Sequence, residues 1–250
     1  MSPPEHGENR LMPQPRSLRA GLHVLNQQTL VTTAARDGGD FKRLFIREPC
    51  GNNTLLLVAT ENLSKIGILE EKIRGEMNEG ELVTYSIEPK TSAQQPYNKM
   101  GMRCLLERIE AMVEFANQNS QMLKEDRIGT VIIGAMENYI QTSNTDNSGA
   151  DFGIVMLYNA NTQCVVQGTS KGVPVDGEYL QEARSGGSWG EEKDRGKVTY
   201  GEILKKVFHK AAQREFGTEY DIAKDWHRAV CGISRYSLLR EVARDLSPIL

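Results

Sequence analysis

Residues 54–65 read TLLLVATENLSK, and this stretch decides the fold class. The run from Leu55 to Ala59 is continuous and apolar, with the length expected of a strand buried on both faces. A helical pattern follows at once, and the charged residues within it, from Lys65 onward, are expected on its solvated side. A strand, a short turn and a helix in this order open an α/β unit. The apolar positions of the helix recur at spacings of three and four: Ile66, Leu69, Ile73 and Met77.

The rest of the chain reads as one α/β domain behind a loose tail. Residues 1–50 are rich in proline, glycine and polar residues, which predicts a mostly flexible tail with at most one docked strand, and residues 51–250 form the domain. The glycine-rich, charged segment 170–198 is expected to be a surface loop. Further strands are predicted at 82–87, 130–134, 151–158 and 164–169, and helices at 105–117, 203–212 and 238–246.

Composition narrows the classes of partner. The formal net charge is -3, so no global basic field attracts nucleic acid or an anionic membrane. No stretch approaches the roughly 18 apolar residues of a membrane span, and the N-terminus lacks the pattern of a secretory signal. The four cysteines lie far apart and form no metal-binding spacing, which favours reduced thiols. We therefore expect a cytoplasmic protein without a transmembrane segment.

The first candidate site is the turn from Thr60 to Lys65. A turn between a strand and a helix exposes N–H groups at the positive end of the helix dipole, where phosphate binds well. Lys65 would add a full charge, while Thr60 and Asn62 would supply hydrogen bonds. The alternative is structural, because Asn62 or Ser64 could cap the helix and Lys65 could be solvated.

The second candidate is Glu137, in the segment VIIGAMENYI directly after a predicted strand. A carboxylate at the C-terminal end of a buried strand lies where α/β sheets place their ligand crevice, and it could hold Mg²⁺ bound to phosphate oxygens. Asp151 begins the next strand and could face the same crevice. An exposed loop glutamate and an aspartate that forms a turn are the structural alternatives.

The third candidate is Asp225-Trp226-His227, near the end of the chain. The indole and imidazole could stack on a base or contact a partner. The structural alternative makes Asp225 a helix cap and Trp226 a core residue, and this alternative is the favoured interpretation.

Several short segments, in order and spacing, carry a resemblance to a known family. They cover about residues 54–215 and begin with the turn at residues 60–65. Together they resemble the inosine/xanthosine triphosphatase family, whose members open with a strand and a Ser/Thr-x-Asn-Pro-x-Lys turn. The other segments are Gln95-Pro96-Tyr97, Gly101 and Arg108 in the following helix, IIGAMENYI at 132–140, GTSKGVPV at 168–175 and GKVTYGEI at 196–203.

The resemblance implies a two-lobed α/β domain with a long mixed central sheet flanked by helices and a cleft between the lobes. It also implies hydrolysis of noncanonical purine nucleoside triphosphates such as ITP and XTP, dependent on Mg²⁺ or Mn²⁺. Thr60, Asn62 and Lys65 would position the triphosphate. Glu137, together with Asp151, would hold the metal, and Glu137 and Lys65 would act in catalysis. Family members are commonly homodimers.

Two departures from the family pattern support a second function. Leu63 replaces the family's proline, and Asn98-Lys99-Met100 replaces the acidic stretch that usually follows the Gln-Pro element. The segments 135–140, 150–157 and 225–235 also resemble the C-terminal domain of eukaryotic proline-rich coiled-coil proteins, which are associated with Golgi and vesicle-exit membranes and with a kinase regulatory subunit. This resemblance implies a catalytically inactive adaptor or regulatory protein with a protein partner, peripheral to Golgi or vesicle membranes. A nucleotide sensor that binds without turnover is a third interpretation.

Overall fold

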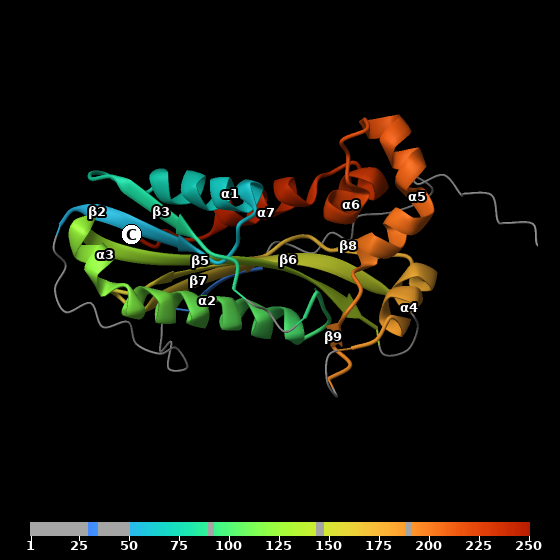
Figure 1. The fold of residues 1–250 in the computed structure, drawn as a ribbon, viewed down its shortest axis with the longest axis horizontal. Coiled ribbons are helices and arrows are strands. Elements are labelled where there is room, and N and C mark those ends of the chain that lie inside the picture. Colours follow the sequence, from blue (N-terminus) through green and yellow to red (C-terminus); the bar gives the residue numbers. More distant parts are fainter. Residues whose placement is uncertain (1–29, 35–50, 90–92, 144–147, 189–191) are drawn as a thin grey trace, which may run out of the picture.

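The computed structural model describes residues 30–34, 51–89, 93–143, 148–188 and 192–250 (Figure 1). Of the predicted tail at 1–50, only one strand lies within the described residues. The strands are β1 (Leu30–Ala34), β2 (Asn53–Val58), β3 (Leu82–Ser86), β4 (Gln95–Pro96), β5 (Ile128–Thr142), β6 (Gly149–Asn159), β7 (Cys164–Thr169), β8 (Val173–Val175) and β9 (Arg195–Gly196). The helices are α1 (Leu63–Arg74), α2 (Met100–Gln118), α3 (Ser120–Glu125), α4 (Gly177–Ser185), α5 (Tyr200–Phe216), α6 (Ile222–Cys231) and α7 (Arg235–Asp245).

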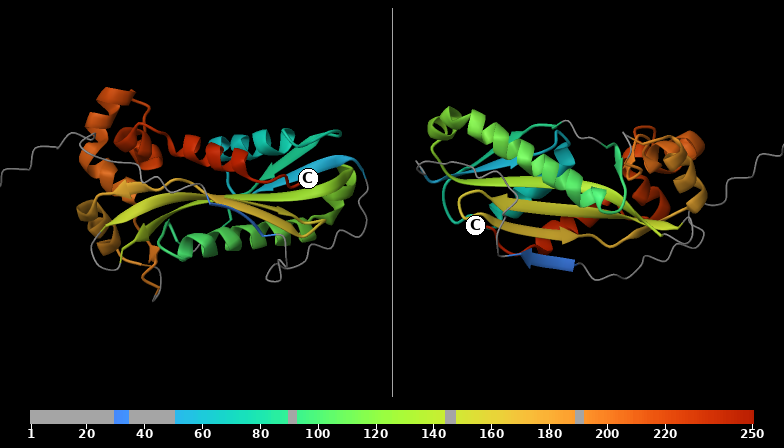
Figure 2. Two further views of the ribbon diagram at one scale, coloured as in Figure 1. Left: turned by 180° about the vertical axis from the view of Figure 1, so that it is seen from behind. Right: turned by 90° about the horizontal axis from the view of Figure 1, so that it is seen from below.

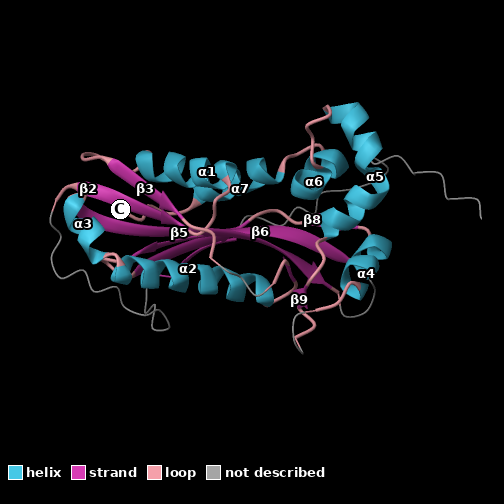
Figure 3. Ribbon diagram, in the orientation of Figure 1, coloured by secondary structure: helices cyan, strands magenta, loops and turns pink. Residues whose placement is uncertain are grey.

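One mixed sheet organises the fold, with strand order β1-β7-β6-β5-β2-β3 and β8 paired to β6 (Figure 3). β2 runs parallel to β3 and β5, whereas β5, β6, β7 and β1 pair antiparallel in succession. The side chains from Leu55 to Val58 are fully buried, because helices cover both faces of β2. The predicted α/β class with a mixed central sheet flanked by helices is confirmed.

Helices cover the two faces of the sheet unequally (Figures 1 and 2). α2 packs on one face, called here the α2 face, over a cluster that includes Leu57, Ile133 and Met156. α1 and α7 pack on the opposite, α1/α7 face, over a cluster that includes Leu56 and Val155. α4, α5 and α6 gather at one end of the sheet around Trp226, Tyr200 and neighbouring apolar side chains. In the described ranges, no helix is long and apolar enough to cross a membrane.

β5 is much longer than the strand predicted at 130–134. It runs for 15 residues, and its second half pairs with β6 from Ala135↔Met156 to Thr142↔Gly149. The prediction ended too early because Glu137, Asn138 and their neighbours look like loop residues, whereas in the structure they lie within a regular antiparallel ladder. Glu137 is therefore inside a strand that continues past its parallel neighbour β2.

The segment predicted as a surface loop, 170–198, contains regular structure. β8 pairs with the start of β6, and α4 follows, with the side chain of its N-cap residue Asp176 accepting from the backbone N–H of Glu178 at 2.9 Å. Leu180 and Ala183 of α4 are buried, which was hard to see in a short stretch rich in glycine and charge. Residues 189–191, at the centre of the predicted loop, lie outside the described residues.

The predicted hairpin and the two C-terminal helices are confirmed. β6 and β7 pair antiparallel around a turn in which the side-chain oxygen of Asn159 accepts from the backbone N–H groups of Asn161 and Thr162, at 3.0 and 3.1 Å. α5 begins at a capping box formed by Thr199 and Glu202. α7 buries Leu239 and Val242 against the sheet.

The close approach of α5 to α6 depends on a glycine. A Cβ atom at Gly201 would lie 2.3 Å from the backbone oxygen of Ala223 in α6, so the helices would have to separate. We expect Gly201→Ala to lower the free energy of unfolding by about 1–3 kcal/mol. Gly67→Ala, in α1, is the control, because nothing lies within 4 Å of the added Cβ and helix propensity favours alanine by about 1 kcal/mol. Urea denaturation of both variants measures this, and equal stability of the two would contradict the proposed packing.

Candidate functional site

Charged side chains gather where the parallel strands end and β5 continues, and this cluster of Lys65, Glu88, Arg108 and Glu137 is called here the crevice cluster. The last hydrogen bond between the β2 segment and β5 joins the N–H of Ala59 to the carbonyl of Gly134 at 3.1 Å. Beyond it, two backbone groups on this edge of β5 bond to charged side chains. The carbonyl of Met136 accepts from Lys65 Nζ at 3.1 Å, and the N–H of Asn138 donates to Glu137 Oε1 at 3.0 Å. The crevice cluster thus lies at the C-terminal ends of β2 and β3, the usual ligand position in α/β sheets.

The turn from Thr60 to Lys65 is held by its own side chains. Asn62 caps α1, since its Oδ1 accepts from the N–H groups of Ser64 and Lys65 at 3.1 and 3.2 Å. Its Nδ2 donates to the hydroxyl of Tyr236, in the first turn of α7, at 3.1 Å. The hydroxyl of Thr60 accepts from the N–H of Asn62 at 3.2 Å. The capping alternative for Asn62 is therefore confirmed, and the cap also ties α1 to α7.

Lys65 is buried, and the expectation that it lies on the solvated side of its helix is wrong. Its side chain turns toward the end of β2, and the residue is only 9% exposed. Burial lowers the pKa of Lys65 from 10.5 to about 8; Glu137 opposes this shift, while Arg235 and Arg108 add to it. The helical spacing carried a signal that was missed, because Lys65 lies four residues before Leu69 and eight before Ile73, on the face of α1 that packs against the sheet.

Arg108 of α2 bridges two carboxylates in the crevice cluster. Its Nε donates to Glu137 Oε2 at 3.0 Å, and one terminal nitrogen donates to Glu88 Oε1 at 2.8 Å and to the carbonyl of Ala59 at 2.9 Å. Glu88 Oε2 accepts from the hydroxyl of Thr60 at 2.9 Å. Burial alone would raise the pKa of Glu88, but the hydrogen bond and charge of Arg108 lower it below its usual value.

Glu88 was missed by reasoning from the sequence. It follows the second parallel strand, β3, just as Thr60 follows β2, so its place at the end of a strand was a usable signal. The carboxyl ends of parallel neighbours meet at one edge of a sheet, which brings the two side chains together.

Glu137 and Asp151, expected to share a metal ion, project from opposite faces of the sheet. Asp151 pairs with Ile140, three positions from Glu137, and side chains alternate along a strand. Glu137 lies on the α2 face, while Asp151 lies on the α1/α7 face. Asp151 is 4% exposed, and its Oδ1 accepts from Asn138 Nδ2 at 3.0 Å. The same oxygen lies 3.3 Å from His227 Nε2. These contacts give Asp151 a structural role that joins β6 to β5 and α6.

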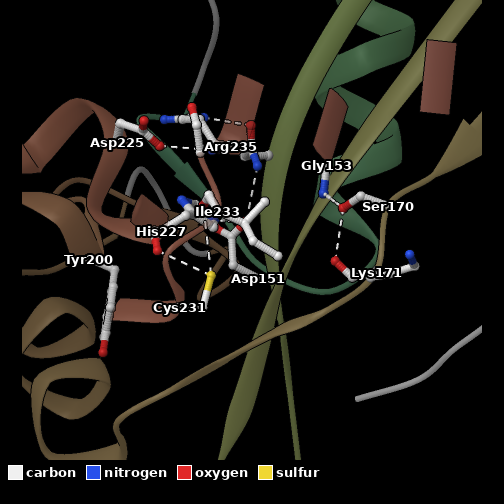
Figure 4. Close-up of polar contacts among 12 residues, drawn as sticks. Asp151, Gly153, Ser170, Lys171, Tyr200, Asp225, His227, Cys231, Ile233 and Arg235 are labelled. Carbon is white, nitrogen blue, oxygen red and sulfur yellow. Dashed lines mark hydrogen bonds and ion pairs between the residues drawn. The ribbon is translucent and has the colours of Figure 1, made fainter. Parts of the chain in front are cut away.

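The segment from Asp225 to Arg235 belongs to the same network (Figure 4). Asp225 has non-helical backbone angles inside α6, and its Oδ1 accepts from the backbone N–H of Arg235, the first residue of α7, at 2.8 Å. A terminal nitrogen of Arg235 donates to Asn138 Oδ1. Asp225 therefore does not cap its own helix, whose N-cap is Asp221.

Trp226 and His227 are core residues. Trp226 is 3% exposed, as the structural alternative predicted, and its ring stacks on His227 with centroids 3.9 Å apart. His227 is 1% exposed, and its Nδ1 has no hydrogen-bond partner among the described residues. Neither ring is placed to stack on a base at the surface.

The acidic groups of the crevice cluster are compatible with a metal ion that arrives together with phosphate. Among the described residues, no group of three or more His, Cys, Asp or Glu side chains is placed to hold an ion by itself. Glu88 and Glu137 do face each other across Arg108. Mg²⁺ is commonly held by one or two carboxylates plus the phosphates of its substrate, so these two residues fit that requirement.

Comparison with known proteins bears on the fold. No protein-family model matches the sequence, and no curated protein matches it. Among solved structures, protein VC0702 from Vibrio cholerae aligns with a TM-score of 0.51 at 12% identity, over 76% of this chain and 91% of that one. PelC dodecamers from Paraburkholderia phytofirmans align with a TM-score of 0.25 at 12–13% identity, over 58% of this chain and 83% of theirs. The likeness to VC0702 supports the α/β fold with its mixed sheet.

The buried charge of Lys65 makes stability depend on pH. Because the pKa is about 8 in the folded chain and 10.5 in the unfolded one, the unfolded chain binds more protons between these values. Stability must therefore rise with pH across this window. Relative to Lys65→Met, we expect the wild type to gain about 3 kcal/mol between pH 7.5 and 10.5, measured by urea unfolding. Lys210→Met, on the exposed side of α5, is the control, and a wild-type curve parallel to that of Lys65→Met would refute the shift.

The bonds of Asp151 also give a test. Asp151→Ala leaves buried donors of Asn138 and His227 without acceptors, so we expect a loss of about 2–4 kcal/mol in unfolding free energy. Removing an exposed ion pair by Glu241→Ala should cost less than about 1 kcal/mol.

Asp151→Asn should leave Mn²⁺ affinity in the presence of nucleotide unchanged, whereas Glu137→Gln should lower it. A large loss of metal affinity in Asp151→Asn would restore the shared site.

Proposed function

We propose that the crevice cluster binds the phosphates of a purine nucleoside triphosphate and that the chain hydrolyses ITP and XTP with Mg²⁺ or Mn²⁺. The observation that carries this proposal is the buried lysine at the end of the parallel strands. Lys65 remains inside the protein although burial lowers its pKa to about 8, and among the described residues its three N–H donors have one acceptor, the carbonyl of Met136. An anionic ligand would satisfy the remaining donors and stabilise the charge.

The charges around Lys65 also favour an anion. The groups that act on it are the carboxylates of Glu88 and Glu137 and the guanidinium groups of Arg108 and Arg235. With Lys65 protonated, three positive groups face two negative ones. The N-terminal end of α1 adds the partial positive charge of its dipole, as in other phosphate sites.

In this proposal Lys65 and the turn at Thr60 and Asn62 hold the triphosphate in place. Water attacks a phosphorus atom, and the bond to the leaving phosphate or pyrophosphate oxygen breaks. Glu137 and Glu88 would hold the metal ion, which supplies charge neutralisation at the phosphate oxygens when bound. The two-lobed shape, with a cleft between the sheet and the α4–α6 end, and a homodimeric assembly belong to the same proposal.

A second candidate is a protein that binds without turnover and serves as an adaptor or regulator of membrane traffic or of a kinase. A specific observation favours it: the four oxygens of Glu88 and Glu137 all accept hydrogen bonds from the protein itself. In addition, Asn98, in the segment that replaces the family's acidic stretch, bonds to the backbone N–H of Thr142 at 2.9 Å. Asn98 Nδ2 also donates to Asp194 Oδ1 at 3.0 Å, which an acceptor-only carboxylate could not do.

Phosphate and pyrophosphate release from ITP, XTP, dITP, GTP and ATP, with Mg²⁺ or Mn²⁺, separates the two functions. We expect turnover of ITP and XTP above GTP and ATP, and a fall of at least 100-fold in kcat/KM for Lys65→Ala and Glu137→Gln. Lys210→Ala is the matched control. If the wild type binds nucleotide without turning it over, and Lys65→Ala abolishes that binding, the protein is a nucleotide sensor. If neither binding nor turnover depends on Lys65 or Glu137, the proposed site is wrong.

A further inference from the structure

Arg108 occupies the position between two carboxylates that a divalent ion would need. The residue is 8% exposed, and its guanidinium group lies 3.0 Å from Glu137 and 2.8 Å from Glu88, measured between nitrogen and oxygen atoms. Two carboxylates in one cluster repel each other unless a cation lies between them. In this structure, that cation is part of the protein.

The guanidinium group is held differently from a purely structural ion pair. Its partner Glu88 is 45% exposed at the side chain, whereas Glu137 is 12% exposed, so the bridge connects a solvent-exposed carboxylate to a nearly buried one. The same terminal nitrogen also donates to the carbonyl of Ala59, directly before the turn that begins at Thr60. Arg108 is thus within reach of both the carboxylates and the turn proposed to bind phosphate.

We propose that Arg108 is a displaceable counter-ion, which holds Glu88 and Glu137 in the ligand-free protein and moves to the phosphates when a divalent ion arrives with them. This inference rests on the proposed function, because the divalent ion enters as a complex with the nucleotide. Arginine suits both states, since its fork of N–H donors matches carboxylate and phosphate oxygens equally well. In the absence of nucleotide, Arg108 and Lys65 together keep divalent ions out of the crevice cluster.

The test uses Mn²⁺ alone, without nucleotide, and follows free Mn²⁺ by electron paramagnetic resonance with the full-length protein. We expect Arg108→Gln to bind one Mn²⁺ at least tenfold more tightly than the wild type, and the added Glu137→Gln change to remove that gain. Arg103→Gln is the matched control on the same helix, since Arg103 is 57% exposed at the side chain and pairs with Glu107 and Glu192. Circular dichroism establishes that each variant folds.

Arg108→Lys covers the case in which Arg108→Gln does not fold. A lysine keeps the charge but cannot reach both carboxylates through separate N–H groups, so we expect a gain in Mn²⁺ affinity of about threefold. Folded Arg108 variants with wild-type Mn²⁺ affinity would overturn the inference. A gain in Mn²⁺ affinity in a protein that turns over no nucleotide would support the role of Arg108 while rejecting the proposed hydrolysis, so the two failures are distinguishable.

Discussion

The backbone of β5 must find hydrogen-bond partners on its β2 side after β2 ends at Val58. A buried carbonyl or N–H without a partner costs a substantial part of a protein's stability, so a strand rarely outlasts its neighbour without compensation. Here charged side chains compensate first: Lys65 Nζ donates to the carbonyl of Met136, and Glu137 Oε1 accepts from the N–H of Asn138. Farther along, Asn98 bonds to the carbonyl of Ile140 and to the N–H of Thr142. The chemistry of the crevice cluster thus follows from the difference in length between two strands.

The remaining charges follow from these two. The ammonium group of Lys65 and the carboxylate of Glu137 are both poorly solvated. On the α2 face, Arg108 supplies a hydrogen bond and a positive charge to Glu137. Arg108 in turn draws in Glu88 from the end of β3, and Glu88 accepts from Thr60. A single chain of contacts therefore connects both parallel strands, α1 and α2. Removing Arg108 would leave Glu137, which is 12% exposed at the side chain, without its ion-pair partner.

The sequence was sufficient for the elements whose apolar pattern is strong. The run Leu55–Ala59, the periodic helix at 203–212 and the hairpin at Asn159–Thr162 were predictable, because local pattern and tertiary burial agree there. The second half of β5 and helix α4 were not, since polar groups there are satisfied by distant partners. Asn138 bonds to Asp151 and Arg235, and the backbone N–H of Asp176, the N-cap of α4, donates to the hydroxyl of Tyr200. Local composition carries no information about a partner that is 13 or 97 positions away.

The candidate site shows the same division. Lys65 and Glu137 could be found from their positions after a predicted strand. The sequence could not reveal on which face of the sheet Glu137 lies, because the face depends on strand register, and the register depends on how far β5 extends. With β5 ending at 134, Glu137 would lie in a loop and Asp151 at the start of the next strand, so the two side chains could converge. With β5 ending at Thr142, the ladder fixes them on opposite faces.

The two faces then have separate tasks. On the α2 face, Glu137, Arg108 and Glu88 form a charged cluster, of which Glu88 is the most exposed member. On the α1/α7 face, Asp151 and His227 are nearly inaccessible and bind α6 to the sheet. Asn138 lies next to Glu137 and bonds to both Asp151 and Arg235. The contacts around Asp151 therefore fix the backbone from which the side chain of Glu137 projects. A ligand that moved Arg108 could therefore act on side chains of the crevice cluster while the sheet and the α6–α7 end stayed in place.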